Sequence, residues 1–218
     1  MGQEEVLNSL RAAVGNPKCN CDYRNNVSIM VRVAVDGGEQ KSVIIDVGKT
    51  FREGAVRWFP EHNVRKIDAI VLTHGHADAY FGLDDLRSIM ARDSSMDVYL
   101  SDECRATVER TFPYLFPVKN SSEKRFVSKV NWRRITNYQT FTPFEGLDMT
   151  PLPVKHGEDM ECMGYMFGRR DTVVYLSDIS RMLPETMGAI MQRKKEQGGI
   201  SLLIVDALHP VREYFSHF

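Results

Sequence analysis

The sequence predicts an α/β fold of four layers, αββα, in which two β-sheets are stacked between outer helices. Apolar runs rich in β-branched residues alternate with segments of helical spacing, and two parts of the chain carry hairpin signals. The 218 residues, 43% of them hydrophobic, are enough for one domain with its own core. Because sheets and helices bury their apolar faces against another layer, we expect residues 1–218 to form a single layered domain.

The first half of the chain predicts a hairpin followed by three helices that alternate with two further strands. Asp36-Gly37-Gly38 is typical of the turn between the hairpin strands, and Pro60 is expected to end the first helix. The expected elements are strands at 27–35, 42–47, 67–73 and 97–100 and helices at 52–59, at 82–91 and from 101 onward.

The second half begins with a poorly periodic segment, residues 113–138, which we interpret as a long insertion with one or two short strands. A helix follows at 184–196, with Pro184 in its first turn, where a proline is well tolerated. The remaining expected elements are strands near 147–154, 163–168, 172–177 and 201–206.

Charge and hydropathy restrict the classes of partner. A net charge of −1 gives no strong attraction to nucleic acid or to an anionic membrane. No apolar stretch approaches the roughly 20 residues of a membrane helix, and the acidic N-terminus does not resemble a secretory signal. We therefore expect a cytoplasmic protein, for which nucleic acid and membrane are not expected as partners.

The four cysteines, Cys19, Cys21, Cys104 and Cys162, are too few and too scattered to predict a disulfide framework. Cys19 and Cys21 could be two thiolates of a structural zinc site, but no second close pair of Cys or His completes it. Reduced thiols are the favoured interpretation.

Three candidate metal ligands, His74, His76 and Asp78, stand at alternating positions directly beyond the predicted strand 67–73. Residues two apart in an extended segment project to the same side, so two imidazoles and a carboxylate converge there. Such ligands suit Zn²⁺, and also Mn²⁺ or Fe²⁺. Taken alone, the run has an alternative interpretation as a polar loop in which Asp78 caps a helix.

Other polar side chains occur at the ends of predicted strands, where loops commonly assemble a site on a rigid scaffold. Asp46 ends the strand 42–47, and His156 and Asp178 each follow a strand. His217 follows the last strand by a loop. This order favours a metal centre over a capping loop.

In this order of residues the chain resembles the metallo-β-lactamase superfamily, whose pattern is an early Asp-x-Gly, then His-x-His-x-Asp-His, then a His, an Asp and a His. The resemblance covers nearly the whole chain. The run from Thr73 to Ala79, followed by Gly-Leu-Asp-Asp-Leu-Arg at 82–87, is similar to the cyclic phosphodiesterase branch, which includes the phosphoribosyl 1,2-cyclic phosphate phosphodiesterases.

The resemblance implies a site for one or two divalent metals per chain, with zinc favoured. It implies that His74, His76 and His156 hold the first metal, that Asp78 and His217 hold the second, and that Asp178 bridges both. Asp46 would orient a ligand histidine through a hydrogen bond.

The chain departs from the family pattern at Ala79, where the family has a second-site histidine, so the second site is one ligand short. The Gly-rich first strand expected before residue 27 and the helix expected after the last histidine are also missing. From these departures we expect a fold truncated at both ends.

The implied activity is a metal-dependent phosphodiesterase that attacks a small cyclic or nucleotide-like phosphodiester through a metal-bound hydroxide. Asp78 would act in catalysis as a metal ligand. His209 would protonate the leaving oxygen, or it is a loop residue hydrogen-bonded to the backbone. Two alternatives remain: an RNA-processing nuclease of the same fold, and a degenerate, non-catalytic metal-binding protein.

Overall fold

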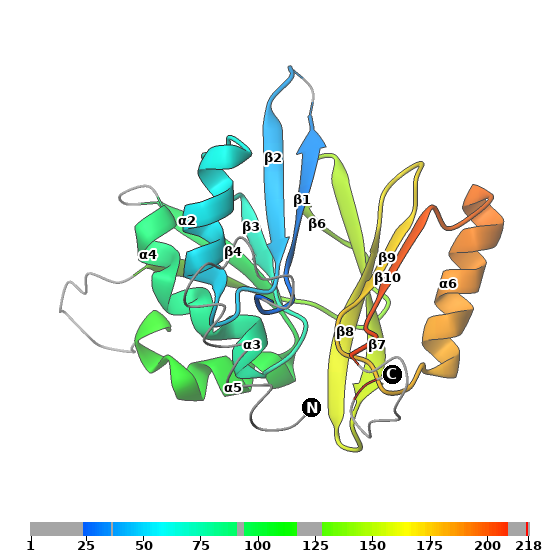
Figure 1. The fold of residues 1–218 in the computed structure, drawn as a ribbon. Helices are drawn as coiled ribbons and strands as arrows, with labels where there is room; N and C mark the ends of the chain where they lie inside the picture. Colours follow the sequence, from blue (N-terminus) through cyan, green and yellow to red (C-terminus); the bar gives the residue numbers. More distant parts are fainter. Residues whose placement is uncertain (1–23, 36, 91–93, 117–127, 209–216, 218) are drawn as a thin grey trace, which may run out of the picture.

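The computed structural model describes residues 24–35, 37–90, 94–116, 128–208 and 217. Its centre consists of two five-stranded sheets that face each other (Figure 1). The first sheet has the strand order β1-β2-β3-β4-β5, with β1 antiparallel to β2 and the other pairs parallel. Its strands are β1 (Ile29–Ala34), β2 (Gln40–Ile45), β3 (Ala69–Val71), β4 (Ser95–Leu100) and β5 (Lys129–Arg134).

The second sheet has the order β10-β9-β8-β7-β6, in which β10 is parallel to β9 and the other pairs are antiparallel. Its strands are β6 (Phe141–Phe144), β7 (Leu147–His156), β8 (Met160–Phe167), β9 (Val173–Leu176) and β10 (Leu202–Val205).

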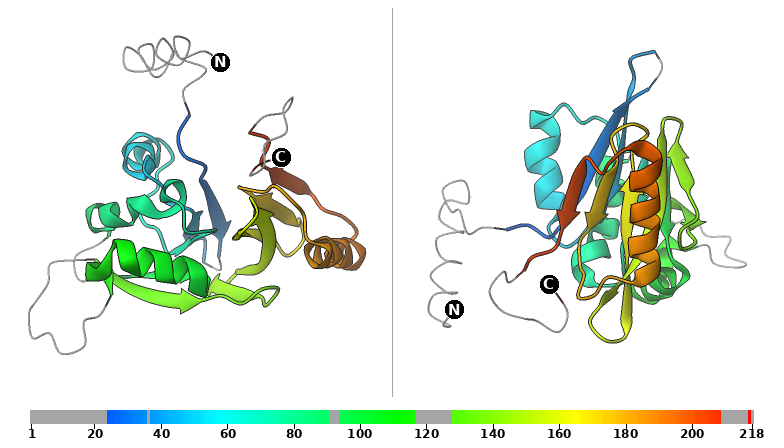
Figure 2. Two further views of the ribbon diagram at one scale, coloured as in Figure 1. Left: turned by 90° about the horizontal axis from the view of Figure 1, so that it is seen from below. Right: turned by 90° about the vertical axis from the view of Figure 1, so that its right-hand side faces the viewer.

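Helices cover the outer face of each sheet, so that four layers are visible from below (Figure 2). α6 (Pro184–Gln197) lies on the second sheet. The elements on the first sheet are α2 (Phe51–Glu61), α3 (Ala77–Tyr80), η1 (Phe81–Asp85), α4 (Leu86–Ile89), α5 (Asp102–Thr111) and η2 (Pro113–Leu115). The predicted four-layer αββα fold is confirmed.

Strand periodicity explains the layers. Neighbouring side chains of β2 point to opposite faces, so Val43 and Ile45 pack between the two sheets while Ile44 packs under the helices. Leu152 and Val154 of β7 face α6 in a third apolar cluster. Strands with apolar groups on both faces are buried in this way, which is why they appear in the sequence as continuous apolar runs.

Several predicted elements have different bounds. Pro60 does not end its helix, because α2 continues to Glu61 with the proline in its last turn. The proline's missing N–H affects only the carbonyl of Val56, a residue that is 73% exposed and can be hydrated. The helix expected at 82–91 is the 3₁₀ turn η1 followed by the single turn α4.

The segment 82–91 does not form a longer helix because Gly82 is pinned against the end of β2. Its N–H donates to Val47 O at 2.7 Å, and a Cβ on Gly82 would lie 2.6 Å from that of Phe51. Leu83 and Leu86 are fully buried, as their spacing predicts.

Within 113–138, the structure describes η2 and β5, while residues 117–127 lie outside the described residues. β6 is a strand that the sequence patterns did not predict. Within the described residues, no helix combines the length and hydropathy needed to cross a membrane.

Candidate metal centre

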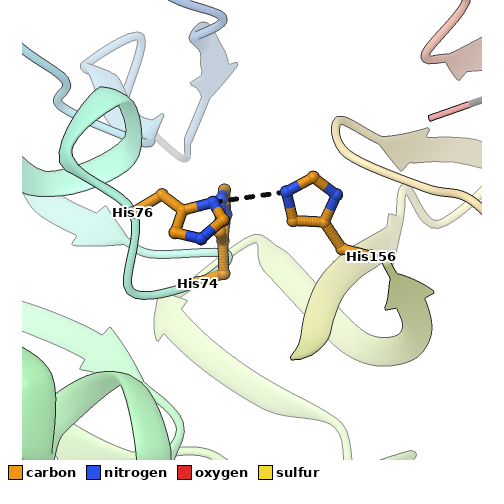
Figure 3. Close-up of side chains that lie close together, drawn as sticks. All are labelled: His74, His76 and His156. Carbon is orange, nitrogen blue, oxygen red and sulfur yellow. Dashed lines mark hydrogen bonds between the residues drawn. The ribbon is translucent and has the colours of Figure 1, made fainter. Parts of the chain in front are cut away.

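Three histidine side chains from two separate elements meet between the sheets (Figure 3). His74 and His76 come from the loop between β3 and α3, where His76 is still extended at φ −92° and ψ 152°. His156 is the last residue of β7. The ring centroids of His74 and His76 are 4.8 Å apart, and those of His76 and His156 are 5.0 Å apart. The predicted convergence of these three residues is therefore present.

The spacing of the ring nitrogens suits a shared metal. His76 Nδ1 and His156 Nε2 are 3.2 Å apart. Two nitrogen ligands of one tetrahedral Zn²⁺, each at about 2.0–2.1 Å, would lie about 3.3 Å apart. The ligand atoms of His74, His76 and His156 all lie within 4.8 Å of one another.

His74 is held by a buried chain of hydrogen bonds that reaches Asp46. The carboxylate of Asp46 accepts from Thr73 N at 2.8 Å and from Thr73 Oγ1 at 2.7 Å. Thr73 Oγ1 is 2.8 Å from His74 Nδ1. Since the threonine proton is donated to Asp46, the histidine must donate its own proton to Thr73, and this fixes the proton on Nδ1.

The other ring nitrogen of His74, Nε2, has a lone pair that is available to bind a metal. His74 is 2% exposed, and its Nε2 is buried without a hydrogen-bond partner among the described residues. Leaving a buried polar atom unpaired costs stability unless something else satisfies it. A divalent metal at this position would satisfy Nε2, so the residues present fit the ion.

The same burial keeps His74 neutral. Burial, reinforced by the neighbouring His76 and His156, lowers the pKa of His74 from 6.5 to about 3. A metal binds neutral imidazole, so this ligand needs no deprotonation at neutral pH. Burial also raises the pKa of Asp46, and the two hydrogen bonds from Thr73 oppose that rise.

A second group of possible ligands lies on the side of the second sheet, where His156, Asp178 and His217 have ligand atoms within 4.8 Å of one another. Asp178 follows β9, and its Oδ1 is 4.0 Å from His217 Nδ1. The rings of His156 and His217 have centroids 4.9 Å apart. Burial raises the pKa of Asp178 and outweighs the opposing effects of Ser177 and His156.

Asp206 is a functional candidate that the sequence analysis missed. It follows β10, and its Oδ2 accepts a short hydrogen bond from His217 Nδ1. Carboxylates commonly orient metal-binding or proton-donating histidines in this way. Its position just beyond a strand is the signal that selected Asp46 and Asp178, and it could have identified Asp206 as well.

Cys162, from β8, is a second group that the sequence did not single out as part of the site. Its Sγ is 3.8 Å from His74 Nδ1 and 3.8 Å from Ser177 Oγ, and the residue is fully buried. With His74 and Asp178 it forms a further possible ligand group. The thiol lies next to the protonated Nδ1 of His74 and therefore away from Nε2, the nitrogen left for a metal.

Asp78 and Ala79 belong to the first turn of α3, which packs on the end of β2. A Cβ on Gly48 would lie 1.7 Å from the carbonyl oxygen of Asp78, so only glycine permits this contact. Val47 N donates to Ala79 O at 2.7 Å. The charge of Asp78 raises the pKa of both Asp46 and Asp178.

Among the described residues, Asp78 belongs to none of the close ligand groups, so its metal role remains a prediction. His209, Cys19 and Cys21 lie outside the described residues.

Comparisons with known proteins agree with this geometry. The family model of the beta-lactamase superfamily domain matches residues 41–214. The octanoyltransferase of Porphyromonas gingivalis is 25% identical over 198 residues, which cover 90% of this chain and 35% of that protein.

Two solved structures are similar in fold. A diphosphatase of the PhnP family is 30% identical with a TM-score of 0.69, over 90% of this chain and 66% of that one. Zinc-bound PqqB from Methylobacterium extorquens is 20% identical with a TM-score of 0.59, over 82% of this chain and 61% of that one.

The chain thus spans about a third of the curated relative and about two thirds of the first of these structures. Its family model match, its two facing sheets and its histidine cluster all agree with one family. The chain belongs to the beta-lactamase superfamily, has the metallo-β-lactamase fold and resembles the PhnP branch.

Proposed function

We propose that this protein is a phosphodiesterase that hydrolyses a small cyclic or nucleotide-like phosphodiester with a divalent metal, zinc being the favoured ion. The observation that carries the proposal is the meeting of His74, His76 and His156 around the unpartnered Nε2 of His74. The small-molecule substrate and the cytoplasmic location expected from the sequence are parts of the same proposal.

A divalent metal at this site would supply Lewis-acid polarisation of the phosphoryl group and would activate water for attack. His74, His76 and His156 would hold the ion, with the carboxylate of Asp178 beside them. His76 is exposed whereas His74 and His156 are buried, so the substrate would approach from the side of His76.

We assign protonation of the leaving oxygen to a histidine from the C-terminal part of the chain. His209 is the donor predicted from the sequence. His217 remains a predicted metal ligand. Asp206 would keep the ring of His217 oriented whether His217 binds a metal or donates the proton.

The name of the PhnP-family neighbour suggests a second candidate substrate. That protein is a diphosphatase, and a diphosphate differs from a diester in its leaving group. Both substrates require stabilisation of the charge that develops at the phosphoryl group during attack. A diphosphate-linked compound is therefore the alternative substrate within phosphoryl hydrolysis.

The test is hydrolysis of bis(p-nitrophenyl) phosphate, a cyclic nucleotide and a nucleoside diphosphate by protein loaded with Zn²⁺, Mn²⁺ or Fe²⁺. We expect turnover of the diesters that chelation abolishes, together with loss of turnover in His74→Ala. A matched control is His62→Ala, because His62 lies beyond the end of α2 and its ring stacks on Trp58.

Preferential cleavage of the diphosphate would move the assignment to the alternative substrate. Absence of turnover with all three ions, while chelation still lowers thermal stability, would instead support the degenerate, non-catalytic metal-binding protein. Absence of turnover together with no effect of chelation would refute the metal-dependent enzyme. Cleavage of RNA with a salt-sensitive affinity would support the nuclease.

A further inference from the structure

We propose that Ser180 is a positioning residue that locks the loop carrying Asp178 onto the end of the strand carrying His156. Ser180 follows Asp178 by two residues, and its side chain bonds to both neighbours of His156. The inference concerns the metal centre and does not require the phosphodiesterase activity proposed above.

The hydroxyl of Ser180 forms hydrogen bonds with the residues directly before and directly after His156. Ser180 Oγ accepts a hydrogen bond from Gly157 N at 3.0 Å and donates one to Lys155 O at 3.1 Å. Gly157 has a φ of 72°, a left-handed conformation that glycine adopts readily. The serine therefore bonds the chain at the point where it turns sharply out of β7.

Backbone bonds complete the attachment. Ser180 N donates to Lys155 O at 2.7 Å, and Lys155 N donates to Arg181 O at 3.0 Å. Lys155 and Arg181 form an isolated antiparallel bridge. The loop after β9 thus pairs with the end of β7 as a very short extra strand.

The sequence of β7 explains why the loop docks there. Beyond the short strand β6, the edge of β7 presents Pro151, Pro153 and then Lys155. The two prolines offer carbonyls but no N–H. Pro151 O accepts from Tyr138 N at 3.0 Å, and Pro153 O accepts from the hydroxyl of Thr186. Lys155 is the residue on this edge with both a donor and an acceptor, and the Asp178 loop uses both.

Two possible metal ligands on separate elements, His156 and Asp178, are thereby held at a fixed separation. The ligand atoms of these residues lie in the same close group. Removing a residue that orients a metal ligand without itself binding the metal typically lowers metal affinity by about 10-fold to 100-fold.

The experiment measures Zn²⁺ affinity by competition with a chromogenic chelator and the absorption spectrum of the Co²⁺-loaded protein. We expect Ser180→Ala to bind Zn²⁺ about 10-fold more weakly and to alter the Co²⁺ spectrum. Ser180→Thr retains the hydroxyl and is expected to stay within about 3-fold of the wild type. Ser201→Ala is the matched control, because it removes a serine hydroxyl that contacts Asp171 at 3.5 Å.

Lys155→Pro is the second variant, and it removes the backbone donor to Arg181 O on an edge where β7 already carries two prolines. We expect it to weaken Zn²⁺ binding in the same direction while the metal-free melting temperature stays near that of Ser201→Ala. Wild-type Zn²⁺ affinity in Ser180→Ala would overturn the proposal, as would equal losses in Ser180→Ala and Ser180→Thr. Because metal binding is read directly, failure here is distinguishable from absence of phosphodiesterase activity.

Discussion

The two halves of the metal centre are built differently. On the side of the first sheet, His74 is 2% exposed and is tied to the 1% exposed Asp46 through Thr73. On the side of the second sheet, the side chains of His217 and Asp206 are 18% and 10% exposed, and neither residue belongs to a helix or strand. One half is fixed by the core and the other by loop contacts, so the same kind of substitution should have different consequences in each.

The largest effect is expected from Asp46→Asn. Asparagine keeps one of the two acceptors that Thr73 uses, but its amide would donate to Thr73 Oγ1. The buried hydroxyl proton then either loses its acceptor or turns to His74 Nδ1, which moves the histidine proton to Nε2, the nitrogen needed by the metal. The free energy of unfolding of the metal-free protein should fall by about 3 kcal/mol, and Zn²⁺ affinity should fall with it. Chemical denaturation of the metal-free protein measures the first quantity. A fully stable Asp46→Asn variant would show that the buried half is not fixed through Asp46.

The pH dependence of stability tests the same half by a different route. The pKa of His74 is about 3 in the folded protein, whereas the ordinary pKa of a histidine, expected in the unfolded chain, is 6.5. Between these values the unfolded state binds the extra proton, so stability is fully present above pH 6.5 and is lost as pH falls toward 3.

The measurement compares metal-free wild type with His74→Asn, so that the opposite contributions of the carboxyls with raised pKa largely cancel. From about pH 7.5 to about pH 5, the wild type should lose about 2 kcal/mol relative to the variant. Parallel stability curves for the two proteins would contradict the lowered pKa.

Thr73→Val separates the hydrogen-bond relay from packing. Valine matches the shape of threonine but removes the hydroxyl between Asp46 and His74. We expect a loss of about 1 kcal/mol in stability and about 10-fold in Zn²⁺ affinity. Thr73→Ser, which keeps the hydroxyl, should restore most of the affinity. Equal affinities for Thr73→Val and Thr73→Ser would contradict the relay.

The smallest effect on stability is expected from Asp206→Asn, the counterpart of Asp46→Asn in the loop-held half. The pair formed by Asp206 and His217 is partly exposed, so the variant should lose less than about 1 kcal/mol of stability. Zn²⁺ affinity should still fall about 10-fold, because Asp206 orients the ring of His217. A stability loss as large as that of Asp46→Asn would erase the difference between the two halves.

Sequence patterns predicted the layers and the convergence of His74 and His76, because alternate positions follow from local geometry. The inclusion of His156 in the same ligand group was implied by the family resemblance, and Asp78, which the alternation also selected, is in none of the close ligand groups of the described residues. The patterns did not predict Asp206, Cys162 or Ser180 as part of the site. The partners of these residues lie far away along the chain, and which distant loops touch is decided by packing. The exact bounds of α2 and α4 were also wrong, since exposure at Val56 and contact at Gly82 overrode the local signals of Pro60 and helical spacing.

The two prolines on the edge of β7 also bear on aggregation. An exposed strand edge with a regular row of N–H and C=O groups can recruit a strand from another molecule. Pro151 and Pro153 interrupt that row, and their carbonyls are already bonded to Tyr138 and Thr186. The strand that delivers His156 therefore presents an edge that another chain cannot extend, which protects the site from intermolecular β-pairing.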